Sequence, residues 1–221
     1  MASFGAILFD FFTLTTIYYH YDRNVIYSKR KYQMKKIALA TILAVSAFAV
    51  SAASVTAEYQ NADGVNGAAS QQGYNLTVRG NVMKGVSADA GIQTRVNDST
   101  DGISSTRLEA GLTGSTSLAP SLPFGVYTRI ATGQKFTTTT NYTYYSVEPG
   151  VTMPFGRSGL TARVGWRYRA AYDTANADET KTWRAGLSYA VTKQDTIGVR
   201  YDRMRGDTNQ NVIAVNYTRG F

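Results

Sequence analysis

The chain has no cysteine and a single histidine, His20, among its 221 residues. Without cysteine it has no disulfide framework, thiol nucleophile or thiolate metal site. His20 lies in a segment that we expect to be absent from the mature protein. The mature chain then also lacks imidazole, the commonest general base and transition-metal ligand. We therefore expect no enzymatic activity, no catalytic residues, no metal and no cofactor.

Long hydrophobic runs are also scarce, and after residue 57 none approaches the roughly 18 residues that a membrane-spanning helix needs. One run, residues 37–50, follows a basic stretch that begins at Met34 and precedes small residues. This order of basic, apolar and small-residue regions is typical of a secretory signal peptide. We assign the signal peptide to residues 34–53, with cleavage after residue 52, 53 or 57.

Residues 1–33 precede this signal. Either a wrongly chosen start codon or a genuine N-terminal extension explains them, and we favour the start codon because an extension would bury the signal. The whole chain has a formal net charge of +8, but residues 1–57 hold six of its 23 Lys and Arg and two of its 15 Asp and Glu. The remainder carries only +4, so we expect no nucleic-acid partner.

Apolar and polar residues alternate along most of the chain after residue 53. In residues 74–82, for example, Leu76 and Val78 alternate with Thr77 and Arg79. Successive side chains of a strand point to opposite faces, so the alternation predicts sheet with one apolar and one polar face. Nine strands follow from the pattern, and residues 54–62 supply a tenth because bacterial barrels have even strand numbers; eight strands is the alternative. The predicted strands are residues 54–62, 74–82, 86–96, 107–115, 124–132, 142–153, 160–171, 182–191, 196–205 and 210–221.

Strand and connection lengths point to a membrane barrel. A tilted strand of about 9–11 residues crosses a bilayer. Short connections, such as 83–85 and 192–195, alternate with the longer polar segments 97–105, 133–141 and 172–179, as periplasmic turns and extracellular loops do. We expect an all-β, transmembrane, antiparallel up-and-down β-barrel over residues 54–221 in the outer membrane of a Gram-negative envelope. A soluble β-sandwich or periplasmic barrel is the alternative. Aromatic residues near strand ends fit the headgroup level of a bilayer: Tyr142, Tyr145, Trp166, Tyr168, Trp183, Tyr189, Tyr201 and Tyr217.

The polar faces of such a barrel line its lumen, where arginine predominates. The predicted pore-lining residues are Arg79, Arg95, Arg107, Arg129, Arg163, Arg167, Arg184, Arg200, Asp89, Glu109, Glu148 and Asp202, and Arg169 and Glu58 share their face. Rings of arginine predict a narrow, porin-like transport channel that favours small anions or acidic solutes. Ten strands lie near the size at which side chains fill the interior, so a closed, ion-paired barrel with a structural or surface-interaction role is the alternative. Seven inward glycines would let neighbouring Arg and Tyr side chains fold over them: Gly91, Gly111, Gly125, Gly150, Gly165, Gly186 and Gly198.

The end of the chain carries a resemblance. Phe221, preceded at alternate positions by Tyr217, Val215 and Ile213, resembles the C-terminal signature of bacterial outer-membrane proteins. The resemblance implies that Phe221 and Tyr217 form an assembly signal, although Arg219 departs from the pattern. It also implies the barrel-assembly machinery as a partner, with outer-membrane lipid and lipopolysaccharide around the barrel.

A second resemblance lies in the last third of the chain. Residues 183–189 (WRAGLSY), 191–195 (VTKQD) and 199–201 (VRY) resemble the small oligogalacturonate-specific porins. Those are narrow barrels with Arg-rich lumens, and the resemblance implies passage of acidic solutes. Their usual barrel has twelve strands, and this chain is shorter.

Overall fold

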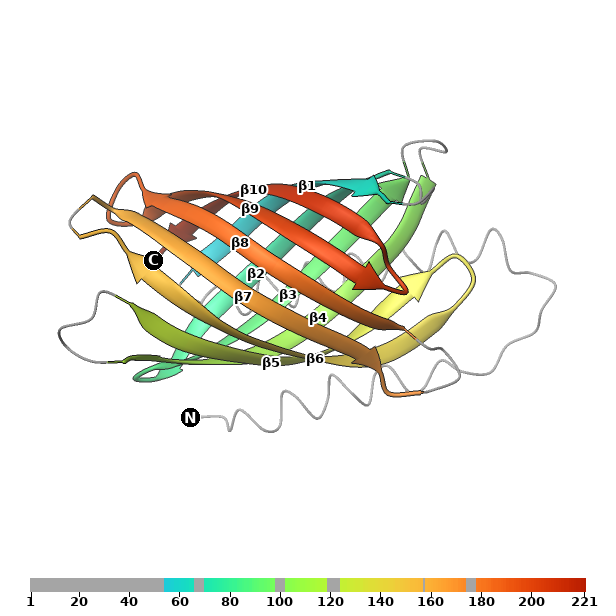
Figure 1. Cartoon of the computed structure of the whole chain (residues 1–221), viewed down its shortest axis with the longest axis horizontal. Helices are drawn as coiled ribbons and strands as arrows, with labels where there is room; N and C mark the ends of the chain where they lie inside the picture. The colour runs from blue at the N-terminus through green and yellow to red at the C-terminus, as the bar shows by residue number, and fades with distance from the viewer. Residues whose placement is uncertain (1–53, 66–69, 98–101, 119–123, 157, 174–177) are drawn as a thin grey trace. The chain divides into compact units, whose positions relative to one another are not determined.

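The computed structural model describes residues 54–65, 70–97, 102–118, 124–156, 158–173 and 178–221. The expected extension and signal peptide, residues 1–53, lie outside them. The described residues form ten strands, each antiparallel to its neighbours in sequence, and the first pairs with the last to close a barrel (Figure 1). The prediction of ten strands in an up-and-down barrel is confirmed, and eight is wrong. The strands are β1 (Ser54–Gly64), β2 (Gln71–Met83), β3 (Val86–Asn97), β4 (Gly102–Ser117), β5 (Gly125–Thr137), β6 (Asn141–Pro154), β7 (Leu160–Ala171), β8 (Glu179–Ala190), β9 (Asp195–Gly206) and β10 (Gln210–Gly220).

The antiparallel order sorts the connections between two ends of the barrel. The C-terminal end holds the end of β10 and the connections that follow β2, β4, β6 and β8 (Figure 1). The loop end holds the connections that follow β1, β3, β5, β7 and β9. At the C-terminal end, Gly85 has a φ of 77° in the tight β2–β3 turn, a left-handed conformation that glycine adopts without steric cost.

Several strands are longer than predicted. Residues 133–137, expected in a long loop, continue β5, and β6 begins at Asn141, so a short hairpin connects the two. The backbone amide of Thr137 donates to the carbonyl of Thr140 at 2.9 Å, which closes this hairpin. Likewise β4 begins at Gly102, inside the expected loop 97–105. These Thr- and Ser-rich segments of β4 and β5 have the polar composition of loops, but their backbones continue the hydrogen-bonded ladder of the sheet.

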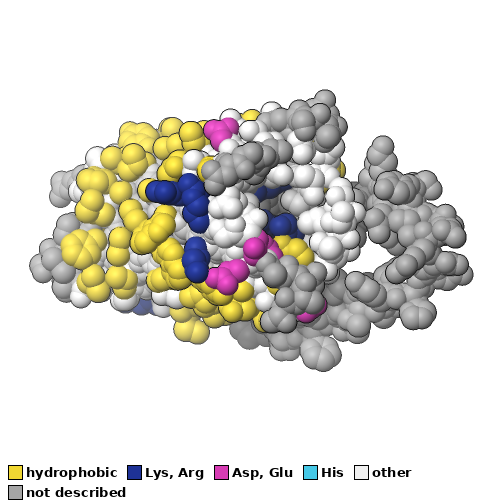
Figure 2. Space-filling view, turned by 45° about the vertical axis from the view of Figure 1, so that its right-hand side comes forward, with side chains coloured by type: hydrophobic (Ala, Val, Ile, Leu, Met, Phe, Trp, Pro, Cys, Tyr) yellow, Lys and Arg dark blue, Asp and Glu magenta, His cyan; other side chains and the backbone are white. Residues whose placement is uncertain are grey.

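The barrel is polar inside and apolar outside. Its buried side chains are mostly charged or polar, and large apolar side chains lie on its surface. Figure 2 shows hydrophobic side chains across much of the barrel wall in view, bordered by Lys, Arg, Asp and Glu. Among the described residues, no helix is long and apolar enough to cross a membrane. Exposed large apolar residues include Leu112, Ile130, Val147, Val151, Val164, Leu187, Ile197, Val199, Ile213 and Val215.

A small apolar cluster interrupts this pattern at the loop end. Ala62, Met204 and Val212 are buried inside the barrel and in contact with one another. Ala62 and Val212 pair across the β1–β10 ladder, where the alternation places them on the inner face. The inner face is therefore not uniformly polar, and it carries a small apolar cluster near its loop end.

Candidate functional site: the charged barrel interior

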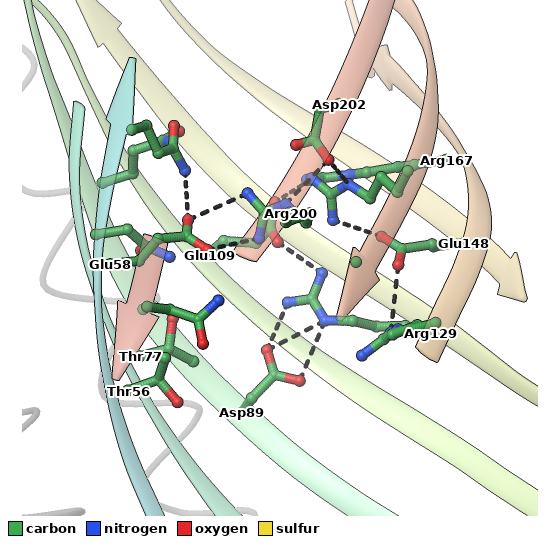
Figure 3. Close-up of a pocket in the computed structure, with 18 of the residues that line it drawn as sticks. Thr56, Glu58, Thr77, Asp89, Glu109, Arg129, Glu148, Arg167, Arg200 and Asp202 are labelled. Carbon is green, nitrogen blue, oxygen red and sulfur yellow. Dashed lines mark hydrogen bonds and ion pairs between the residues drawn. The ribbon is translucent and has the colours of Figure 1, made fainter. Parts of the chain in front are cut away.

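The predicted pore-lining residues all lie on the inner face, around a cavity of about 450 Å³. β2, β3, β4, β5 and β7 supply them at odd positions, and β6, β8 and β9 at even positions, because side chains alternate along each strand. Figure 3 shows charged side chains from several strands converging in this cavity. The residues that line it include Arg79, Arg95, Arg107, Arg129, Arg163, Arg167, Arg184, Arg200, Asp89, Glu109, Glu148 and Asp202.

Glu109 on β4 accepts hydrogen bonds from three side chains. Arg129 Nη1 donates to its Oε1 at 2.7 Å, and the Tyr144 hydroxyl donates to its Oε2 at 2.8 Å. Arg167 on β7 forms an ion pair with the same Oε2. Arg167 and Glu109 are three strands apart, so this pair crosses the interior and joins separate parts of the wall (Figure 3).

Asp89 on β3 binds the guanidinium of Arg129 from the other side. Arg129 Nε donates to the two carboxylate oxygens of Asp89 at 3.1 and 3.2 Å. Arg79 Nη2 lies 3.8 Å from Asp89 Oδ1, and its side chain is 40% exposed. Arg129 is therefore shared by two carboxylates, whereas Arg79 remains accessible near the C-terminal end.

Glu148 on β6 is the third buried acceptor. Arg184 Nη1 lies 2.7 Å from its Oε2 and Arg163 Nη2 lies 3.3 Å from its Oε1. The Tyr127 hydroxyl donates to Oε1 at 3.0 Å, and the Arg163 guanidinium lies over the Tyr127 ring at 3.8 Å. One carboxylate thus holds an aromatic and two cationic side chains.

Glu58 and Asp202 complete the network near β1 and β9. Arg200 donates to both Glu58 oxygens, from Nη1 at 2.7 Å and from Nη2 at 3.1 Å. Its Nε donates to Asp202 Oδ1 at 2.9 Å, and Arg184 Nε lies 3.5 Å from the same oxygen. The pairs that involve Arg184 link Glu148 to Asp202, so the network is continuous from β1 to β6.

Arg95 and Arg107 differ from the other inward arginines. Both are buried, and among the described residues neither forms an ion pair with a carboxylate. Arg95 donates to Gln210 Oε1 at 2.7 Å, while Arg107 donates to Gln93 Oε1 at 3.3 Å and its Nε has no partner. A buried cation without a counter-charge leaves the interior with an unbalanced positive potential.

A separate acid lies at the loop end. Asp178, between β7 and β8, is buried, pairs with Arg169 at 3.0 Å and accepts a hydrogen bond from the Tyr142 hydroxyl. Lys135 Nζ lies 3.9 Å away. Burial raises the pKa of Asp178, but the charges of Arg169 and Lys135 and the Tyr142 hydrogen bond outweigh it and lower the pKa below its usual value.

The interior carries more positive than negative charge. Nine arginines and Lys135 face six carboxylates there, an excess of four positive charges over the described residues. Sequence reasoning placed the nine arginines but missed Lys135 and Asp178, since both fell in expected loops. It also assigned Tyr142 to the lipid headgroup level, which is wrong: Tyr142 shares the parity of Glu148 on β6 and points inward.

The inward glycines make room for side chains from neighbouring strands. A Cβ on Gly150 would come within 2.4 Å of the Tyr127 ring, and one on Gly165 within 2.3 Å of its hydroxyl oxygen. A Cβ on Gly111 would lie 2.8 Å from Arg129 Nη2. At these positions Tyr and Arg side chains fold over glycine as expected, and they occupy part of the lumen.

Of the predicted assembly signal, Tyr217 lies on the outer face of β10 and Phe221 follows directly after its last residue. Tyr217 and Phe221 are 44% and 74% exposed. The Tyr217 hydroxyl donates to Asp195, which also pairs with Arg219 at 3.3 Å. Arg219, the departure from the expected pattern, is thus accommodated by an ion pair at the C-terminal end.

No protein-family model matches the sequence, and the search of curated proteins found no significant match. The barrel is similar to the solved structure of the NanC porin, with 11% identity, a TM-score of 0.48 and coverage of 76% of this chain and 100% of that one. It is also similar to the KdgM porin in complex with disordered oligogalacturonate (12%, TM-score 0.42, coverage 76% and 99%). A third similar structure is outer membrane phospholipase A from Escherichia coli (12%, TM-score 0.46, coverage 76% and 92%). The similar structures thus include both porins and a phospholipase.

Proposed function

We propose that the protein is an outer-membrane β-barrel. The observation that carries this proposal is the inverted distribution of side chains, with charged residues buried and large apolar residues exposed around the wall. Monomeric soluble proteins rarely expose contiguous apolar patches larger than a few hundred Å². A closed barrel leaves no unpaired strand edge, as hydrocarbon surroundings require.

Within the membrane, the barrel is proposed to act as a narrow channel that favours small anions or acidic solutes. The excess of positive charge in the interior supports a preference for anions. A lumen lined by charges of one sign attracts ions of the opposite sign, and the low dielectric constant of the surroundings strengthens this attraction. Arg79 and Arg163 support entry from the C-terminal end, since their side chains are 40% and 39% exposed and line the cavity. No enzymatic role is proposed, since residues 58–221 contain no histidine.

A closed barrel with a structural or surface-interaction role is the second candidate. The Arg167–Glu109 pair crosses the interior, and Arg95 on β3 reaches Gln210 on β10. Such contacts narrow a lumen that Tyr and Arg side chains already fill in part.

Single-channel recording on refolded residues 53–221 distinguishes the two. If the barrel is a channel, we expect small, anion-selective currents. Their selectivity for anions should decrease when Arg163, Arg167 and Arg200 are replaced by Ser. Arg219→Ser, on the outer wall, is the matched control and should keep wild-type selectivity. A correctly folded, inserted barrel that never conducts would overturn the channel and support the closed barrel.

The last strand is proposed to carry the assembly signal. Tyr217 on the outer face of β10 and Phe221 directly after it are both exposed, so neither is packed in the barrel interior. The partners of this proposal are the barrel-assembly machinery during biogenesis and the lipids around the mature wall.

A further inference from the structure

The outer wall of β8 and β9 carries three cations at the loop end: Lys181, Arg203 and Arg205. Lys181 lies directly opposite Arg205, and Arg203 lies opposite Trp183, so the three form one cluster over two neighbouring strands. Lys181 is 58% exposed, and Arg203 is also exposed. Among the described strands, the other outward-facing basic residue is Arg219, which lies at the opposite end.

Local contacts leave most of this charge available. Lys181 pairs with Glu179 at 3.0 Å, but both side chains are more than half exposed, and such pairs contribute little. Arg203 has no carboxylate partner among the described residues. By contrast, Arg219 pairs with a carboxylate at 3.3 Å.

The guanidinium of Arg205 is held at the surface of the barrel. Its Nη1 donates to the backbone carbonyl of Met204 at 2.6 Å, and its Nη2 donates to Asn211 Oδ1 at 3.3 Å. These contacts use neutral acceptors, so they position the cation without neutralising it. The acids nearby, Glu179 and Asp207, lie closer to the loop, where the backbone amide of Glu179 donates to Asp207.

Toward the loop end, the apolar wall stops sooner on β9 than on β7. On β7 the outward positions from Leu160 to Ala170 are all apolar or aromatic, about 33 Å of strand at about 3.3 Å per residue. On β9 the outward apolar stretch runs only from Ile197 to Tyr201, about 13 Å. The cations on β9 therefore lie directly beyond its apolar stretch, at the border of the apolar wall on the loop side.

Aromatic side chains border the cluster on its apolar side. Trp183 is 61% exposed and Tyr201 45%, and Tyr168 pairs with Lys181 in the β7–β8 register. Tyr and Trp side chains favour the boundary between hydrocarbon and headgroups. The cluster is therefore positioned at headgroup depth.

We propose that Lys181, Arg203 and Arg205 bind the phosphate groups of a phosphorylated glycolipid, of the lipid A class, in the outer leaflet. The inference rests on the proposed outer-membrane location. Three cations on one face match a headgroup with two phosphates better than one with a single phosphodiester, since guanidinium and ammonium groups each contact phosphate oxygens. The acyl chains of such a lipid would lie against the aromatic border.

Lipid binding to the refolded barrel in neutral-detergent micelles tests this site. Binding of lipid A, dephosphorylated lipid A, phosphatidylglycerol and inorganic phosphate is measured by native mass spectrometry and titration. Each cation removed should weaken lipid A binding about fivefold, the fold-change that corresponds to about 1 kcal/mol. The combined Lys181→Gln, Arg203→Gln and Arg205→Gln variant should bind lipid A about a hundredfold more weakly, and Arg203→Gln alone about fivefold. Arg219→Gln is the matched control and should bind as the wild type does.

Several results would overturn the assignment. These are an unchanged affinity in the triple variant, equal binding of dephosphorylated lipid A or phosphatidylglycerol, or competition by inorganic phosphate at a similar concentration. Insertion into phosphatidylcholine vesicles is measured on the same preparations. A barrel that inserts but does not prefer lipid A refutes this site and leaves the proposed function standing, whereas a barrel that does not insert refutes both.

Discussion

Replacing Glu109 by Gln should destabilise the barrel strongly, because Glu109 is the shared counter-charge of two arginines. After the change, Arg129 keeps Asp89, but Arg167 keeps only Ser146, at 3.3 Å, and its Nε has no partner. Removing one partner of a buried ion pair typically costs about 3–5 kcal/mol. We expect the low end, about 3 kcal/mol, because Gln still accepts a hydrogen bond and the Glu109 side chain is 18% exposed.

The assay is urea unfolding of the refolded barrel in lipid vesicles, followed by the fluorescence of its two tryptophans. Glu179→Gln is the control, because its pair with Lys181 is exposed and its loss should not shift the midpoint measurably. Combining Glu109→Gln with Arg167→Met should recover part of the loss, since the stranded charge is then removed. A Glu109→Gln midpoint equal to that of the wild type would refute the reasoning, as would a double variant no more stable than the single one.

Two further predictions concern packing and pH. Gly150→Ala places a Cβ 2.4 Å from the Tyr127 ring and should lower the free energy of unfolding in urea by about 1–3 kcal/mol. Gly114→Ala is the control: its Cβ would have nothing within 4 Å, so it should leave the unfolding midpoint unchanged. Equal midpoints for the two variants would contradict this account of the glycines. Asp178 has a lowered pKa in the folded state, so its charge stabilises the fold above about pH 4 and this contribution is lost as the pH falls through the lowered pKa. The stability difference between wild type and Asp178→Asn should therefore be constant near neutral pH and shrink below about pH 4, and a difference that grows on acidification would refute the assigned sign.

The strands, and the positions in each strand that face the interior, could be predicted from the sequence because side chains alternate strictly between the two faces of a strand. Arg129 and Glu148 point inward for that reason, and they do so in the structure. Tyr127 and Tyr144 were missed although they share the parity of these residues. A tyrosine suits either a lipid-facing or a polar environment, so its type alone does not indicate its face.

The ion-pair partners could not be predicted from alternation. Arg167 meets Glu109 from three strands away, which depends on the tilt and stagger of the closed barrel. The positions of Lys135 and Asp178 depended on how far the ladder extends toward the loop end. Polar composition did not reveal that extension, because a strand there is as hydrophilic as a loop.

The pairing of β1 with β10 has a consequence for how the chain folds. The hydroxyls of Thr56 and Thr218 lie 2.8 Å apart although 162 residues separate them along the chain. That contact forms late, since the entropy of bringing such distant segments together must be overcome before their hydrogen bonds can compensate. A nascent chain that lacks β10 would expose the unpaired edges of β1 and β9, each able to pair with a strand from another molecule. Completion of synthesis is thus a physical precondition for a monomeric product, and premature termination should yield aggregates rather than a smaller barrel.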